Sequence, residues 1–213
     1  MSERRSHVLV TAPVREPFTV EYVKKHVRIP AGMTDEDRLV SDWIVSARTR
    51  GEIETGRQFV TATWDLRLEC FPGYEFELSY PPLQTVVSVT YRGVDGVQTV
   101  LDSTRYQFDA PGGPTAPAGR LRPAYGLYWP TTQPGAFDAV VIRIIAGYGD
   151  ALDTDNVVIS VPAPIRQAIL IAIGDYAEGR QSPQRLTGGS ATLADDVSWR
   201  LWAYRVRQTI AAA

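Results

Sequence analysis

Residues 34–59 read TDEDRLVSDWIVSARTRGEIETGRQF, a stretch whose spacing of apolar residues predicts one long amphipathic helix. Thr34 is a suitable N-cap, and Asp37, three residues on, can complete a capping box. Gly56 is a candidate C-cap, because glycine enters the left-handed backbone region without a Cβ penalty. The apolar residues that recur at helical spacing are Leu39, Val40, Trp43, Ile44 and Ala47. Nothing in this helix forms a pattern typical of catalysis.

The composition of the chain excludes several classes of protein. With 213 residues, 44% of them hydrophobic and 22% charged, it is typical of a soluble globular protein. A net charge of -2 gives no global field toward nucleic acid or an anionic membrane. We expect no secretion signal and no membrane span. Cys70 is the single cysteine, which suits a reducing cytosol, and the alternating pattern around it predicts a buried apolar role.

Two further helices are predicted on either side of a long section with a different period. Residues 18–29 predict a short helix with Thr19 as its cap, and Pro30 ends it. Val161-Pro-Ala-Pro164 opens a second strong helix, whose apolar residues share one face.

Between these helices the apolar residues alternate with polar ones, which predicts antiparallel strands. Pro72-Gly73 and Asp95-Gly96 mark turns, and residues 110–119 (APGGPTAPAG) predict an exposed loop. The predicted strands centre on residues 63–71, 74–80, 86–91, 97–101, 106–108, 120–124 and 139–147.

This order of elements predicts an α+β fold. We expect the N-terminal helices and the long helix of the C-terminal half to pack as a small helical bundle, built from residues 18–60 and 161–181. Residues 61–160 would form an inserted antiparallel β section. Residues 1–17 would be an N-terminal arm, and residues 182–213 a linker followed by a C-terminal helix or arm.

The patterns of the common catalytic and metal sites are missing from the sequence, so we expect no enzyme, no cofactor and no metal. His7 and His26 lie in terminal or basic contexts, and the sequence contains neither a nucleophile elbow nor a phosphate-binding glycine loop. The best metal candidate is the acidic run of Asp150, Asp153, Asp155 and Asn156, whose spacing departs from the EF-hand pattern. The alternative to a metal site is that these residues form a solvated acidic loop. A third hypothesis is that they form the acidic site of a hydrolase.

Aromatic residues near the end of the β section are a candidate binding surface. Tyr125, Tyr128 and Trp129, with Arg120 and Arg122 nearby, could stack against carbohydrate, peptide or single-stranded nucleic acid. The alternative is that they cover the core or form a subunit contact.

A second candidate surface lies at the C-terminus, where aromatic residues and an arginine follow a polar segment, a composition that protein interfaces favour. An ordinary C-terminal helix docked on its own domain is the alternative. The candidate partner-binding residues are Trp199, Leu201, Trp202, Tyr204 and Arg205.

Several segments, taken in order, resemble the head–tail connector proteins of tailed phages, the family named after gp8 of phage phiE125 and related to the gp6-like adaptors. The resemblance spans roughly residues 18 to 206. In the family the terminal segment carries a proline before Tyr-Arg, whereas this chain has Ala203. The segments that carry the resemblance are Val23–Arg28, Ala47-Arg48, Glu52–Phe59, Pro81–Leu83, Val86–Tyr91, Asp95-Gly96, Gly147-Tyr148, Val161–Ile169, Tyr176–Arg180 and Trp202–Val206.

The resemblance implies a non-enzymatic, structural role. Such adaptors form a homo-oligomeric ring, typically of twelve copies, beneath the portal of the capsid, and they receive the stopper or tail proteins. The resemblance implies the virion neck as the location, with assembly in the host cytoplasm. DNA would pass through the ring without sequence-specific contact, and no membrane would be involved. A β-sheet module that binds carbohydrate or peptide through Tyr125, Tyr128 and Trp129 remains the alternative function.

Overall fold

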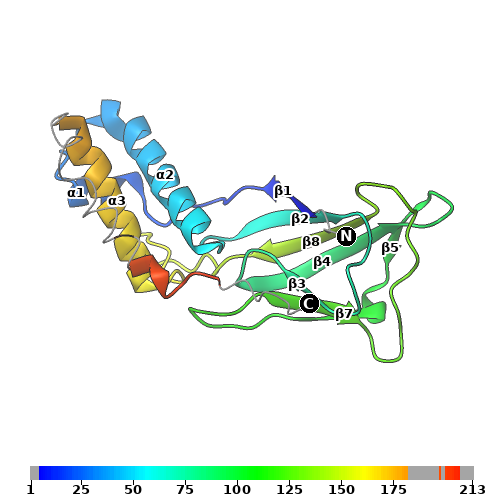
Figure 1. The fold of residues 1–213 in the computed structure, drawn as a ribbon. Helices are drawn as coiled ribbons and strands as arrows, with labels where there is room; N and C mark the ends of the chain where they lie inside the picture. The colour runs from blue at the N-terminus through cyan, green and yellow to red at the C-terminus, as the bar shows by residue number, and fades with distance from the viewer. Residues whose placement is uncertain (1–4, 182–196, 198–199, 207–213) are drawn as a thin grey trace. The chain divides into compact units, whose positions relative to one another are not determined.

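The computed structural model describes residues 5–181, residue 197 and residues 200–206, and the chain divides into two compact units (Figure 1). One, the β unit, comprises Met1–Val14 and Thr61–Gly147. The other, the helical unit, comprises Arg15–Val60 and Tyr148–Ala213. Each unit is therefore built from two separate stretches of the chain.

The β unit contains two antiparallel sheets. The larger sheet has the strand order β1-β2-β8-β4-β5, and the smaller has the order β3-β7-β6. The strands of the larger sheet are β1 (Arg5–Thr11), β2 (Ala62–Leu68), β8 (Val140–Ala146), β4 (Leu83–Arg92) and β5 (Gln98–Leu101). Those of the smaller sheet are β3 (Phe76–Leu78), β7 (Gly119–Pro123) and β6 (Tyr106–Asp109), preceded by a 3-10 turn, η2 (Ser103–Arg105).

Both sheets contribute side chains to one core in the β unit. Alternate residues of β8 are buried, as expected for a strand with a single core face. The register places Leu66 of β2 and Val89 of β4 on either side of Ile142. Gly119 of β7 allows the second sheet to approach, because a Cβ there would lie 2.5 Å from Leu83 Cδ2. The core comprises Leu66, Leu68, Phe76, Leu78, Leu83, Val86, Val89, Leu101, Tyr106, Leu121, Val140, Ile142 and Ile144.

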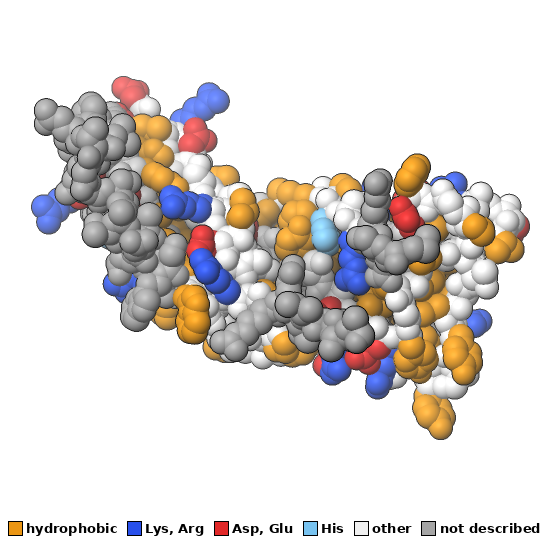
Figure 2. All heavy atoms as spheres, viewed as in Figure 1, with side chains coloured by type: hydrophobic (Ala, Val, Ile, Leu, Met, Phe, Trp, Pro, Cys, Tyr) orange, Lys and Arg blue, Asp and Glu red, His pale blue; other side chains and the backbone are white. Residues whose placement is uncertain are grey.

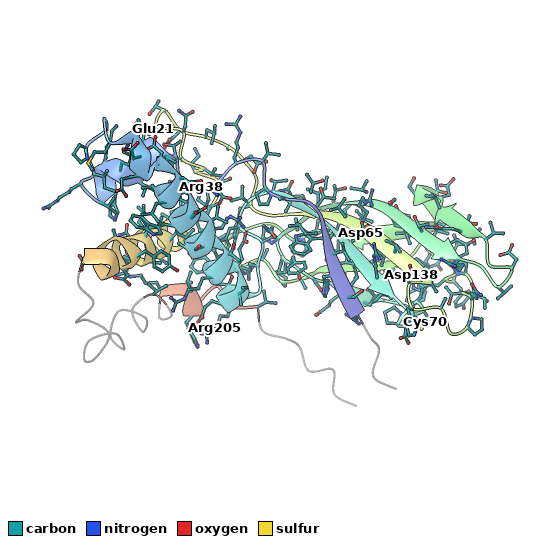
Figure 3. All side chains as sticks on the ribbon, turned by 90° about the horizontal axis from the view of Figure 1, so that it is seen from above. Glu21, Arg38, Asp65, Cys70, Asp138 and Arg205 are labelled. Atoms are coloured by element: carbon teal, nitrogen blue, oxygen red, sulfur yellow. The ribbon has the colours of Figure 1, made fainter. Side chains whose placement is uncertain are left out.

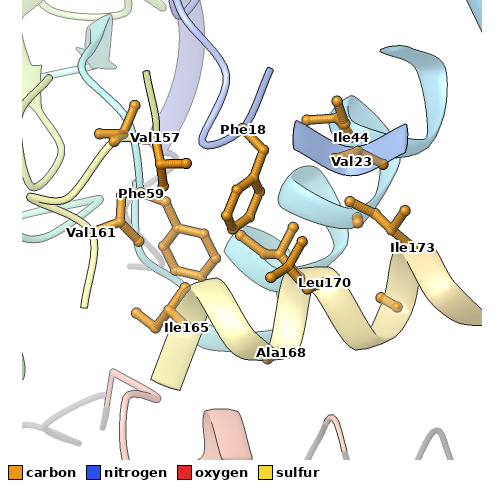
Figure 4. Packing of buried hydrophobic residues seen from close by; sticks show 14 of the residues in the cluster. Phe18, Val23, Ile44, Phe59, Val157, Val161, Ile165, Ala168, Leu170 and Ile173 are labelled. Atoms are coloured by element: carbon orange, nitrogen blue, oxygen red, sulfur yellow. The ribbon is translucent and has the colours of Figure 1, made fainter. Parts of the chain in front are cut away.

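The helical unit contains α1 (Val20–His26), a 3-10 turn η1 (Thr34–Glu36), α2 (Asp37–Thr55) and α3 (Ala163–Gln181). The Thr19 hydroxyl accepts from Tyr22 N at 3.2 Å, which confirms it as the cap of α1. Gly56 has φ +69° and ends α2, as predicted. Helices α2 and α3 lie side by side, and apolar residues from all three helices and the adjoining loops form one core (Figure 4).

The start of α2 differs from the prediction, because Thr34 makes no capping hydrogen bond and the chain enters α2 through η1. Lys24 of α1 provides the reason. It is buried, and its Nζ donates to the carbonyl oxygens of Ala31 and Met33, at 3.1 and 3.0 Å, and to Asp37 Oδ1 at 2.7 Å. This ammonium neutralises and holds the carboxylate that would otherwise complete a capping box.

The predicted small helical bundle is wrong. The chain is α+β, but two antiparallel sheets with a shared core account for the β section, and the helices are few. Residues Arg5–Thr11, expected in an arm, form strand β1 and pair with β2. The spacing of apolar residues predicts which helices and strands form, but it does not predict how strands far apart in sequence pair. The two-sheet unit was therefore not predicted from the sequence. Among the residues that the structure describes, no helix is long and apolar enough to cross a membrane.

Candidate partner-binding surfaces

The C-terminal segment, residues 200–206, packs against the helical unit. Leu201 is 2% exposed and belongs to the helical core, and Tyr204 packs against that core. Val206 N donates to Thr55 O at 2.8 Å, so the segment contacts the C-terminal end of α2. Arg57 Nε donates to the carbonyl of Tyr204, and Arg205, labelled in Figure 3, pairs with Glu54.

The five predicted partner-binding residues therefore have different environments. Leu201, Tyr204 and Arg205 contact their own unit, as in the alternative of a C-terminal segment docked on its own domain. Trp202 is 62% exposed, although its neighbour Leu201 is buried. Trp199 lies outside the described residues. Of the described members of this set, Trp202 and Arg205 are exposed, and Trp202 is the exposed aromatic residue that could contact a partner.

Glu52 organises the end of α2 that receives this segment. Its Oε2 accepts from Arg48 Nη1 at 2.6 Å, and its Oε1 accepts from Gln58 Nε2 at 2.7 Å and from Phe59 N at 2.9 Å. Burial raises the pKa of Glu52, although Arg48 opposes that shift. The carboxylate thus fixes the chain that follows Gly56, including Arg57, which binds the C-terminal segment. Sequence reasoning missed this role, because glutamate in a charged helix is usually solvated.

Aromatic side chains of the β unit line a groove with a volume of about 450 Å³. The rings of Phe71 and Trp129 stack in parallel, with centroids 4.4 Å apart and an interplanar angle of 1°. Trp129 Nε1 donates to the carbonyl of Tyr74 at 3.1 Å, and the Tyr74 ring meets Tyr128 edge-on at 6.5 Å. The residues that line the groove are Cys70, Phe71, Gly73, Tyr74, Tyr128, Trp129, Pro130, Thr131 and Thr132.

This groove contains part of the predicted stacking surface. Trp129 is half-buried and Tyr128 is 81% exposed, and both line the groove. Tyr125 is 99% exposed and lies outside its lining. The sequence reading missed Phe71 and Tyr74, which flank the Pro72-Gly73 turn and reach Trp129 only through the fold. Exposed hydrophobic side chains are visible over the β unit, at the right of Figure 2.

The two arginines of the predicted surface do not join the aromatic groove. Arg120 pairs with Glu75 and Asp109, each at 3.0 Å, and Arg122 lies 3.5 Å from Glu75. These groups line a separate depression with a volume of about 150 Å³. Acidic partners neutralise both arginines, so the pair does not form the basic track that single-stranded nucleic acid binding uses.

The prediction of a buried role for Cys70 is wrong, because its side chain is exposed (Figure 3). Strand β2 ends at Leu68, so the alternation of the strand does not extend to Cys70. The thiol instead lines the aromatic groove.

The acidic run after β8 forms a turn. Asp153 Oδ1 accepts from the backbone nitrogens of Asp155 and Val157, each at 2.9 Å, and Leu152 and Val158 form an isolated bridge across the turn. The carboxylate of Asp153 therefore stabilises the loop. Within the described ranges, no three or more His, Cys, Asp or Glu residues gather in a group that could hold a metal ion.

The chain shares its fold with chains in solved structures of gene transfer agent (GTA) particles, two of them structures of the neck. A chain in the neck of an empty GTA particle, computed with C6 symmetry, has a TM-score of 0.76 and 20% sequence identity; the match covers 97% of this chain and 98% of that chain. A chain in the neck of the native particle, computed with C12 symmetry, has a TM-score of 0.71, 20% identity and the same coverage.

A chain in the virion of the native GTA particle has a TM-score of 0.72 at 19% identity, again over 97% of this chain and 98% of that one. At such low identity the comparison shows the shared fold. No protein-family model matches the sequence, and no curated protein matches it.

Proposed function

We propose that this chain is a structural subunit of the neck of a tailed phage or phage-like particle. In this role it is a head–tail adaptor that forms a ring beneath the portal and links the portal to stopper or tail proteins. The observation that carries the proposal is the shared fold, which covers 97% of this chain and 98% of the neck chain and therefore includes both units.

The symmetry of the related particles supports a ring. Those necks were computed with C6 and C12 symmetry, and a closed ring needs an interface that joins two different faces of each copy. In the proposed ring, twelve copies surround a channel through which DNA passes without sequence-specific contact. The subunit acts in the virion neck and assembles in the host cytoplasm, without a membrane.

The surfaces described above are compatible with a role that depends on contact. Trp202 is an exposed aromatic residue on the helical unit, and Tyr128 is one on the β unit. Aromatic residues dominate the energetics of many protein interfaces. We propose no catalysis, no cofactor and no metal for this subunit.

Deletion of the gene, with complementation by a tagged copy, tests this role. We expect filled heads without tails from the deletion, and the tagged protein in the neck of complemented particles by electron microscopy. Normal tailed particles without the protein, or a tagged protein absent from the purified neck, would contradict the proposal.

The groove favours a second candidate function, a β-sheet module that binds carbohydrate or peptide. Tyr128 and Trp129 line the groove, whereas Tyr125 would contribute only at its periphery. Binding of the purified protein to a glycan array, lost on Tyr128→Ala, would support this function. The absence of glycan binding would remove the carbohydrate form of it.

A further inference from the structure

The aromatic groove of the β unit is uncharged. The side chains that line it come from Cys, Phe, Tyr, Trp, Pro and Thr, together with one glycine. The Trp129 indole is already bonded to the Tyr74 carbonyl, so the wall is fixed before any ligand arrives. Uncharged grooves with rigid aromatic walls suit proline-rich segments, whose rings pack flat on aromatic faces and lose little conformational freedom.

The chain itself contains a segment of matching chemistry. The loop between β6 and β7, residues 110–119, contains Pro111, Pro114 and Pro117 at three-residue spacing and no charged residue. Pro114, Thr115 and Pro117 are exposed. Two other loops differ in this respect, because the β4–β5 turn carries Asp95 and the loop after β8 carries three aspartates. A charged segment would lose hydration in this groove without gaining an opposite charge.

The loop and the groove of the same chain lie at opposite ends of the β unit. Gly119, where the loop ends, lies against Leu83, which pairs with Ala146 at one end of β8. The groove begins at Cys70, just beyond Leu68, which pairs with Val140 at the other end of β8. Strand β8 spans about 20 Å between these ends. In Figure 1 the β6–β7 loop and the chain that follows β7 accordingly lie at opposite ends of the β unit.

We propose that the groove binds the proline-rich loop, residues 110–119, of a second copy of this chain. The inference rests on the proposed ring role and names one of the contacts that would close the ring. A groove at one end of the β unit and its ligand at the other form a head-to-tail contact, which is the kind of interface that builds rings.

Cysteine cross-linking of the full-length protein tests this contact directly. Cys70, the single cysteine of the chain, lies in the groove, and Thr115→Cys adds an exposed thiol at the tip of the loop. With a short bismaleimide we expect covalent dimers and higher multimers of Thr115→Cys. The matched control is Ile53→Cys, a 79%-exposed position on α2, which should give severalfold fewer multimers. Adding Cys70→Ser to Thr115→Cys should remove the higher multimers.

A pair of tyrosine variants separates the groove from its surroundings. Tyr128→Ala removes an exposed wall of the groove, and we expect it to lower the yield of multimers from Thr115→Cys severalfold. Tyr125→Ala removes a nearby tyrosine that lies outside the lining, so the yield should not change. In parallel, a synthetic peptide of residues 110–119 should slow the alkylation of Cys70 in the wild-type protein.

Each outcome decides the proposal. Multimers that depend on Cys70, Thr115→Cys and Tyr128 support it. Equal multimers from Ile53→Cys, or no multimers from Thr115→Cys, overturn it. If the peptide protects Cys70 but no multimers form, the groove binds a proline-rich segment of another protein, and a second copy is excluded. Tagged protein located in the neck without this cross-link would overturn the contact and leave the neck role intact.

Discussion

Arg48 of α2 binds Glu16 through two hydrogen bonds, from Nε to Oε2 at 2.6 Å and from Nη2 to Oε1 at 3.1 Å. The same guanidinium binds Glu52 at 2.6 Å, and the Arg48 side chain is 9% exposed. The carboxylates raise the pKa of Arg48 despite its burial, so the charge persists at any practical pH. One buried cation therefore joins the chain before α1 to the middle of α2.

Arg48→Met should therefore strongly destabilise the helical unit. Removing the cation leaves two carboxylates close together with little solvent, and breaking a buried pair costs about 3–5 kcal/mol. Urea unfolding, followed by helical circular dichroism, measures the loss. The matched control is Arg205→Met, because the ion pair between Arg205 and Glu54 is half-exposed. This control should cost less than about 1 kcal/mol. A loss of less than about 1 kcal/mol for Arg48→Met as well would show that Arg48 acts only as a solvated pair.

The sequence predicted the local elements well, because local elements depend on local patterns. The helical period located α2 and α3, and Gly56 and Thr19 marked helix ends that the structure confirms. The bundle was wrong because no local pattern reveals that β1 pairs with β2 or that two sheets share a core. Such pairings are set by side chains far apart in sequence.

The candidate sites were less predictable than the local elements, because they too depend on contacts between residues far apart in sequence. Tyr128 and Trp129 attracted attention as aromatic residues in a proline-broken loop, and both line the groove. Phe71 and Tyr74 escaped notice because their contact with Trp129 exists only in the folded chain. In the C-terminal segment, composition suggested an interface, but it could not separate buried Leu201 from exposed Trp202.

Alkaline pH should destabilise the helical unit through Tyr148. Burial raises the pKa of Tyr148 to about 12. In the unfolded chain the pKa is about 10, so between about pH 10 and 12 the unfolded state binds fewer protons and stability falls as pH rises. Tyr148→Phe cannot titrate, so the stability of the wild type relative to this variant should decline across that window. Urea unfolding of both proteins at several pH values measures this difference, and a constant difference would exclude Tyr148 as the cause.

Acidic pH should loosen strand β1 through His7. Its Nε2 lies 2.8 Å from Ser79 Oγ, and burial, aided by the charge of Arg5, lowers the pKa of His7. Because the unfolded state takes up the proton first, stability falls as pH drops below about 6.5. Hydrogen exchange of the β1 amides, corrected for intrinsic rates, should therefore accelerate below that pH. His7→Gln should exchange with little pH dependence, and the same acceleration in this variant would assign the effect to another group.

Replacing each of two helical glycines with alanine should change the stability of the helical unit in opposite directions. A Cβ at Gly51 of α2 would lie 2.8 Å from Phe59 Cε2, whereas at Gly174 of α3 it would meet nothing within 4 Å. Gly51→Ala should therefore cost about 1–3 kcal/mol through overpacking. Gly174→Ala should stabilise the helical unit by up to about 1 kcal/mol, because alanine has the higher helix propensity. Thermal unfolding measures both changes, and shifts of the same sign would contradict this account.

Alanine variants of Leu201 and Trp202 should distinguish a loss of stability from a loss of partner binding. Leu201→Ala truncates a side chain that is 2% exposed in the helical core and should cost about 2–5 kcal/mol of stability. Trp202→Ala removes a side chain that is 62% exposed and should change stability by less than about 0.5 kcal/mol. If Trp202 contacts a neighbour in the particle, this variant should complement a gene deletion poorly despite a normal unfolding curve. Full complementation by Trp202→Ala would show that the C-terminal segment serves its own unit and that the partner-binding surface lies elsewhere.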